Sequence, residues 1–337
     1  MPPSRMKMSR LSALVAAVLM MGQTAPAAPV SQGDPDLGPI LAKVRRHAAV
    51  EGERLWPGYG AAPFEFLLVL ADKEVLLCRT APVINATFTP DGADPQTGCN
   101  RQVRPRSQLS DRMLAAMPIF APPPTIVMGT PRTTGLSEGA WVRTIYHEHF
   151  HQFQYSRSGY FDRLKALDLA GGDDSGMWVL NYAFPYGDPA VGKAHQAASL
   201  ALAEAVAARG RPDFLPQFDR YLAAREAFRR SVSMRDWRYL EFQLWQEGVA
   251  RWTEIAVAAS DPDPAVRAAA ATMEAAAITA LGRQDLQVRG REIVYAHGAG
   301  EAMLLEACGP AWRRAYLQTM AMGPLLTAAR ARCASAS

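Results

Sequence analysis

The spacing of apolar residues predicts a short extended region followed by a long helical one. A polar lead-in at residues 31–38 precedes apolar positions that recur at helical spacing over residues 37–48, and this helix ends near Pro57. Two apolar, branched runs follow at residues 64–70 and 74–78. Only three residues separate them, so the two runs predict a β-hairpin.

The segment between this hairpin and residue 141 carries several turn signals. Residues 80–105 contain Pro, Gly, Asn and Asp repeatedly, which predicts a long loop. Three prolines then lead into residues 125–128, a short apolar run that predicts a strand at the edge of a sheet. Ser137 is a candidate N-cap, with Glu138 in the first turn of the next helix.

From Trp141 onwards the apolar pattern has a helical period over most of the chain. We therefore predict an α+β fold formed by one unit over residues 28–337. Residues 28–158 form a β-containing lobe in this prediction, and residues 159–337 form a helical lobe. The expected helices cover residues 141–157, 189–209, 216–230, 236–260, 264–281, 296–307 and 310–320.

The first 27 residues resemble a secretory signal peptide. Basic residues precede an apolar run at residues 11–21, which is followed by Ala25-Pro26-Ala27. The alternative is a retained membrane anchor, but the run is too short to cross about 30 Å of hydrocarbon, and no cysteine follows it to accept a lipid. We expect removal of residues 1–27, no stable membrane insertion afterwards, and an exported protein that is periplasmic or secreted.

The composition is typical of a globular protein and does not indicate a nucleic-acid partner. Hydrophobic residues make up 49% of the chain and charged residues 20%, as in ordinary globular proteins. The net charge is only +4, and no basic block is interleaved with aromatic residues. Nucleic acid is therefore not an expected partner.

The mature chain would contain four cysteines, Cys78, Cys99, Cys308 and Cys333. An even number in an exported protein permits two disulfides, which four cysteines can form in three ways. Pairing by proximity in the sequence predicts Cys78 with Cys99 and Cys308 with Cys333. No close CxxC spacing is present, so we do not expect these sulfurs to bind metal.

The most informative chemistry lies in the segment HEHFH at residues 147–151. His147 and His151 are four residues apart, so on a helix both imidazoles project from one face and can bind one Zn²⁺. Glu148 follows the first histidine and could act as a general base for a metal-bound water. His149 points away from this face, and we interpret it as a surface residue rather than a ligand. The chance occurrence of HExxH in such a chain is on the order of one per cent.

A catalytic zinc needs a third protein ligand, for which Glu247 is the candidate. Glu247 continues the apolar stripe of Leu240 and Leu244, where a carboxylate is unfavourable without a cation. The alternative is a surface ion pair between Glu247 and Arg251, four residues apart. Gly248 weakens the helix by roughly 1 kcal/mol relative to alanine, which indicates that another backbone approaches closely there.

These motifs resemble those of the gluzincin metallopeptidases, in which HExxH is followed downstream by a Glu-Gly pair on a helix. Residues 245–250 (WQEGVA) are similar to the Trp-x-x-Glu-Gly segment of the aminopeptidase branches, and residues 295–299 (YAHGA) resemble their Tyr-x-Lys-Gly-Ala segment. The resemblance implies a zincin-like fold with an edge strand over the active-site helix, and Glu247 as the third zinc ligand. It also implies that Tyr295, or else His297, stabilises the oxyanion of the reaction intermediate. Packing in the core is the alternative role for Tyr295.

The chain also departs from the gluzincin pattern. The spacer between His151 and Glu247 is much longer than in typical members, and the Gly-x-Met-Glu-Asn signature that binds a substrate amino terminus is absent from the sequence. Aminopeptidase activity therefore does not follow. Glu254 matches a glutamate found in some members, where it orients a ligand, although it could equally be a free surface carboxylate.

The expected function is that of an exported zinc metallopeptidase acting on a peptide or protein substrate. The alternative is a catalytically silent zinc-binding interaction protein of the same fold. Hydrolysis of a non-peptide amide or ester is a third option.

Overall fold

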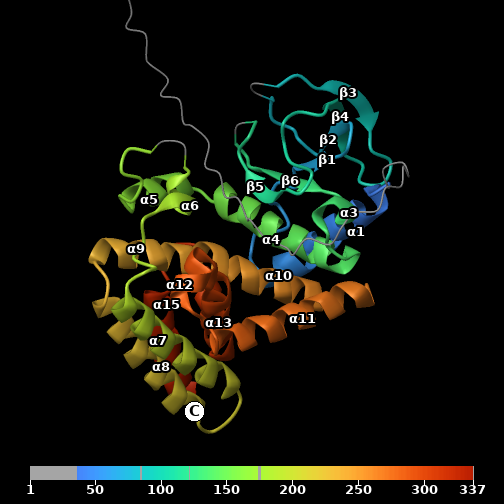
Figure 1. The fold of residues 1–337 in the computed structure, drawn as a ribbon. Helices are drawn as coiled ribbons and strands as arrows, with labels where there is room; N and C mark the ends of the chain where they lie inside the picture. Colours follow the sequence, from blue (N-terminus) through green and yellow to red (C-terminus); the bar gives the residue numbers. More distant parts are fainter. Residues whose placement is uncertain (1–35, 84–85, 121, 174–175, 337) are drawn as a thin grey trace, which may run out of the picture.

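The computed structural model describes residues 36–83, 86–120, 122–173 and 176–336. Within these ranges the N-terminal part forms a β-sheet and the C-terminal part is mostly helical, as predicted from the apolar pattern (Figure 1). The expected signal peptide at residues 1–27 lies outside the described residues. None of the described helices is long and apolar enough to cross a membrane.

The sheet of the described chain has six strands in the order β3-β4-β2-β1-β6-β5. The pair β1 and β6 is parallel, and the other neighbouring strands are antiparallel. The predicted hairpin is confirmed as β1 and β2, paired from Phe66 with Leu77 to Val69 with Glu74. The strands are β1 Phe66–Val69, β2 Lys73–Leu77, β3 Thr89–Ala93, β4 Asn100–Pro105, β5 Leu114–Met117 and β6 Thr125–Gly129.

Two sequence-based expectations about the sheet were wrong. The predicted loop at residues 80–105 contains β3 and β4, whose residues are exposed or only partly buried and therefore lack an apolar alternation. The strand expected at the edge, at residues 125–128, is β6, which lies between β1 and β5. The prolines before β6 lie outside its paired residues. The edge strand on this side of the sheet is β5, whose two central alanines are poor strand formers.

Alternate residues of the sheet pack into two separate apolar clusters. Phe66 and Leu68 of β1 belong to the main core, while Leu67 and Val69 belong to a smaller cluster on the opposite face. The face that carries Phe66 is covered by α4 (Glu138–Ser156) (Figure 1).

Helix α4 lies at the centre of the molecule. Ser137 caps its N-terminus, as predicted, by accepting a hydrogen bond from the backbone N–H of Ala140. Strands β5 and β6 contact α4 on one side, and α10 (Val249–Ala259) and α11 (Pro264–Leu281) contact it on the other. Nearly all of its residues are buried, so its side chains are held in place from every direction.

Most helices of the helical lobe follow the predicted order, but the helix expected at residues 310–320 is only the short α14 (Trp312–Tyr316), and the long helix α15 (Gly323–Ala336) was not predicted. The helix expected at residues 236–260 is one continuous run of α9, a π-helical turn η2 and α10. The remaining elements are α1 Gly38–His47, η1 Ala48–Gly52, α2 Glu53–Leu55, α3 Pro131–Thr134, α5 Tyr160–Ala166, α6 Trp178–Asn181, α7 Pro189–Ala207, α8 Phe214–Arg230, α9 Met234–Gln243, η2 Leu244–Gly248, α12 Leu286–Arg289, η3 Gly290–Glu292, α13 Ile293–Ala307, α14 Trp312–Tyr316 and α15 Gly323–Ala336.

Two covalent links and one close helix contact fix these elements. The disulfides join Cys78 with Cys99 and Cys308 with Cys333, so the pairing predicted from proximity is confirmed. The close approach predicted at Gly248 is also confirmed, because a Cβ atom added there would lie 2.3 Å from the Cα of Gly298 in α13. The turn that carries Glu247 therefore packs directly against α13.

Candidate metal centre

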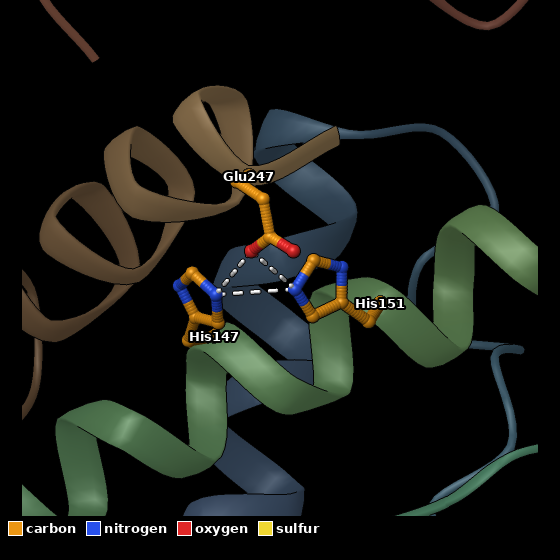
Figure 2. Close-up of side chains that lie close together, drawn as sticks. All are labelled: His147, His151 and Glu247. Carbon is orange, nitrogen blue, oxygen red and sulfur yellow. Dashed lines mark hydrogen bonds and ion pairs between the residues drawn. The ribbon is translucent and has the colours of Figure 1, made fainter. Parts of the chain in front are cut away.

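His147 and His151 project from one side of α4 and face each other (Figure 2). Their Nε2 atoms are 3.1 Å apart, and their side chains are 3% and 0% exposed. The one-turn spacing of the motif therefore brings both imidazoles to one point, as expected from helical geometry.

Glu247 completes the group from a different part of the chain. Its Oε2 lies 3.5 Å from Nε2 of His147 and 3.3 Å from Nε2 of His151. Figure 2 shows this oxygen between the two imidazoles. The carboxylate is buried and does not pair with Arg251, so the alternative of a surface ion pair was wrong. Glu247 belongs to the π-helical turn η2, and such turns occur frequently at functional sites.

The three ligand atoms could hold a metal ion. Metal–ligand bonds of about 2.0–2.1 Å in a tetrahedral arrangement place neighbouring ligand atoms about 3.3 Å apart, which matches the separations seen here. In addition, Oε2 of Glu247 is buried and accepts no hydrogen bond of normal geometry from the described residues. A cation would satisfy this oxygen, whereas a buried carboxylate oxygen without a partner costs free energy of folding.

The other ring nitrogen of each histidine is bound by a second group. Nδ1 of His147 lies 2.5 Å from Oε2 of Glu254, and Nδ1 of His151 lies 2.7 Å from Oε1 of Gln154. Nδ1 of His151 also lies 3.2 Å from the amide nitrogen of Gln246. In the tautomer that carries the hydrogen on Nδ1, as the two oxygen partners favour, the Nε2 lone pairs are directed at the centre. Glu254 is buried and in contact with a ligand, so the alternative that it is a free surface carboxylate was wrong.

Glu254 is kept ionised by its neighbours. Its Oε1 accepts hydrogen bonds from Arg143 and Arg251, both of which are buried. Burial alone would raise the pKa of Glu254, but Arg251, Arg143 and His147 together lower it to about 2. An ionised carboxylate at this position holds the ring of His147 in one orientation.

Glu148 is fully buried beside the histidines, and its two oxygens are in different environments. Its Oε2 accepts a hydrogen bond of 2.7 Å from the backbone N–H of Ala116 in β5, while Oε1 accepts none from the described residues. Burial raises the pKa of Glu148, and the neighbouring His147 and His151 oppose this rise. The residue therefore has one anchored oxygen and one oxygen available as a proton acceptor.

Tyr295 lies beside the group, but His297 does not. The ring centroid of Tyr295 is 6.0 Å from that of His147, and its hydroxyl accepts a hydrogen bond of 3.4 Å from Nη1 of Arg291. Nε2 of His297 is 3.1 Å from the hydroxyl of Tyr221, in a separate buried cluster. Two residues along a helix are about 200° apart around its axis, so Tyr295 and His297 point in nearly opposite directions. The expectation that His297 reaches the metal centre was therefore wrong.

His149 and Arg291 are placed differently from what the sequence indicated. His149 is not a surface residue, because it is 3% exposed and packed between the rings of Tyr59 and Phe64. As predicted, it is not part of the ligand group. Arg291 was not anticipated: its Nη2 donates a hydrogen bond of 2.7 Å to Oε1 of Glu247. An arginine in a short turn before a helix carries no sequence signal that would distinguish it from a surface residue.

Comparisons with known proteins identify no relative of this chain. No protein-family model matches the chain, and neither a curated protein nor a solved structure does. Its function therefore has to be argued from the geometry of the centre.

Proposed function

We propose that this chain is an exported, zinc-dependent metallopeptidase of the gluzincin type with a zincin-like fold. The observation that carries the proposal is the buried group of His147, His151 and Glu247, with Glu148 beside it. Two histidines and one glutamate are a ligand set used by catalytic zinc in peptidases, which leaves a position for water. A centre that is only structural has no need for Glu148.

When bound, the metal would supply a Lewis acid and make a bound water more acidic. The chain supplies the other functions. Glu148 would accept a proton at Oε1, which takes no hydrogen bond from the residues that the structure describes, and return it to the leaving amine. Tyr295 is the candidate donor to the oxyanion, since its ring lies beside His147.

The edge strand β5 supports an extended peptide as the substrate. Met113 pairs with β6 through its carbonyl, which accepts a hydrogen bond from Gly129, whereas Ala116 donates its N–H to Glu148. Because pairing alternates along an antiparallel strand, the N–H of Ala116 points away from β6, towards the side of β5 that no other described strand pairs with, next to the general base. A peptide could add to this edge by β-augmentation, which places its backbone near the centre and needs no particular side chain.

The two disulfides support export, because such bonds persist in oxidising compartments. The second candidate, a silent zinc-binding interaction protein, is favoured by one observation: the three candidate ligands and Glu148 are all buried. A peptidase needs Glu148 for its activity, whereas a silent zinc centre does not.

The test is the substitution Glu148→Gln, which removes the proton acceptor while keeping the size of the side chain. We expect the variant to bind one equivalent of zinc and to lose at least about 100-fold in peptide hydrolysis, because general-base catalysis contributes about that much. Metal content and cleavage of a broad peptide library are the measurements. Glu138→Gln, at an exposed position of the same helix, is the matched control. A wild-type protein that is loaded with zinc and cleaves no peptide would favour the silent centre.

A further inference from the structure

The two oxygens of Glu247 have different partners. Oε2 faces the imidazoles of His147 and His151, whereas Oε1 accepts a hydrogen bond of 2.7 Å from Nη2 of Arg291. Figure 2 shows one carboxylate oxygen directed between the rings and the other directed away from that point. A carboxylate can bind a metal through one oxygen or through both, so the partner of Oε1 affects which mode is available.

Arg291 is itself held in place by other groups. Its Nε donates to Oε1 of Gln243 at 3.2 Å, and its guanidinium lies 5.9 Å from the ring centroid of Tyr295. The side chain is 16% exposed, so the ion pair with Glu247 is largely shielded from water. A charge-assisted hydrogen bond in such surroundings is stronger than a neutral or solvated one.

The local backbone delivers Arg291 to this point. It lies in the turn η3, between α12 and α13. Gly290, directly before it, has φ 53° and ψ −131°, a conformation that residues with a side chain rarely adopt. The turn therefore depends on a glycine to direct the next side chain towards Glu247.

We propose that Arg291 is a positioning residue of the metal centre, which holds Oε1 of Glu247 so that this ligand offers only Oε2 to the metal. This inference rests on the proposed function. A glutamate that bound through both oxygens would occupy two positions on the ion and compete with the water that a hydrolase needs. The arginine cannot be deprotonated under ordinary conditions, so it competes for Oε1 at any working pH.

A simpler role for Arg291 would be to neutralise a buried carboxylate, and the coordination number separates the two roles. Cobalt(II) is the probe, because its visible absorption is strong in four-coordinate centres, several-fold weaker in five-coordinate ones and weakest in six-coordinate ones. We expect the wild-type protein loaded with cobalt to absorb strongly. We expect Arg291→Gln to lose most of this absorption, because the released Oε1 also binds the ion.

The matched control is Arg313→Gln. Arg313 also pairs with a glutamate, Glu306, at 2.5 Å and has a similar exposure of 13%, but it lies in α14. This variant should keep the wild-type spectrum. An unchanged cobalt spectrum in Arg291→Gln, with cobalt bound, overturns the proposal.

A second measurement uses only the wild-type protein, in case Arg291→Gln does not fold. The infrared difference between cobalt-loaded and metal-free protein reports how a carboxylate binds. Stretching bands of a one-oxygen carboxylate support the proposal, and bands of a two-oxygen carboxylate overturn it. Neither measurement depends on hydrolysis, so a protein that cleaves nothing leaves this test intact. A chain that binds no cobalt overturns the metal centre and this inference with it.

Discussion

Two histidines of the helical lobe illustrate how burial controls single side chains. The rings of His195 and His297 lie 5.6 Å apart inside the lobe. Burial lowers the pKa of His195 to about 3, with a contribution from His297, and burial together with Arg225 lowers the pKa of His297 to about 3. Both rings are therefore neutral in the folded protein at neutral pH.

The lowered pKa values of His195 and His297 predict a loss of stability in mild acid. Between about pH 6.5 and pH 3 the unfolded chain takes up protons that the folded chain does not, so the free energy of unfolding falls as the pH falls. The slope is up to about 1.4 kcal/mol per pH unit for each histidine. Other buried groups also titrate in this window: His149, whose pKa burial lowers to about 4, adds to the loss, whereas Glu65, whose pKa burial raises to about 7, opposes it. The difference between wild type and a variant that lacks one histidine therefore isolates the contribution of that histidine.

Denaturant unfolding of wild type and of His195→Gln over this window measures the effect. The variant should show a shallower dependence on pH. Equal slopes in the two proteins would contradict the prediction.

For single residues, the sequence predicts relative positions when the residues lie on one helix. His147, Glu148 and His151 lie on α4, so their spacing alone places them together. Glu247 needed a resemblance to a known family as well, because no local pattern states which distant helix meets α4. Arg291 could not be predicted, since its role depends on a turn conformation and on a partner far away in the sequence.

Among the elements, the crossing of η2 and α13 determines where Glu247 lies. Gly248 and Gly298 meet with no space for a side chain, since a Cβ atom on either would lie less than 3 Å from a Cα atom of the other. A substitution in this crossing must push α13 away from the turn that carries the ligand.

Gly248→Ala should therefore destabilise the protein by about 1–3 kcal/mol, the usual cost of overpacking, and weaken metal binding. Gly192→Ala is the matched control, because Gly192 lies in α7 with open space around its Cα. That control should instead stabilise the helix by about 0.5–1 kcal/mol. Unfolding free energies and a metal titration test both; a Gly248→Ala protein as stable as wild type would show that the crossing is adaptable.

The elements themselves were predicted where they bury an apolar face. Most of the long helices and the hairpin β1–β2 follow the apolar period and were predicted, although the long helix α15 was not. Strand β3 has only exposed residues and offers no such pattern. Strand β5 was missed because Ala115 and Ala116 are poor strand formers, and its position at the sheet edge comes from tertiary packing. The π-helical turn in the run from α9 to α10 has no sequence signal either.

For the whole molecule, the metal group links two parts of the fold. His147 and His151 belong to the helix under the sheet, while Glu247 belongs to the helical lobe (Figure 1). A metal bound only by the folded protein stabilises it by mass action, by about 4 kcal/mol when free metal is 1,000 times its dissociation constant.

Removal of the metal by a chelator should therefore lower the free energy of unfolding of the wild-type protein. The loss should be larger when the concentration of free metal before chelation is higher. Glu247→Ala should bind metal weakly and respond little to a chelator. Thermal melts with and without metal measure both effects. A chelator response in Glu247→Ala as large as in wild type would show that the metal binds elsewhere.

The origin of the third ligand also sets an order of events during synthesis. The two histidines and their helix leave the ribosome well before residue 247, and until the later helices have docked only two of the three ligands are in place. Under the proposed function, tight metal uptake must then wait until the turn that carries Glu247 has been made and has docked on α4. A product truncated before η2 would lack Glu247 and hold only two of the three candidate ligands, so metal content would report on molecules that extend beyond this turn and are folded.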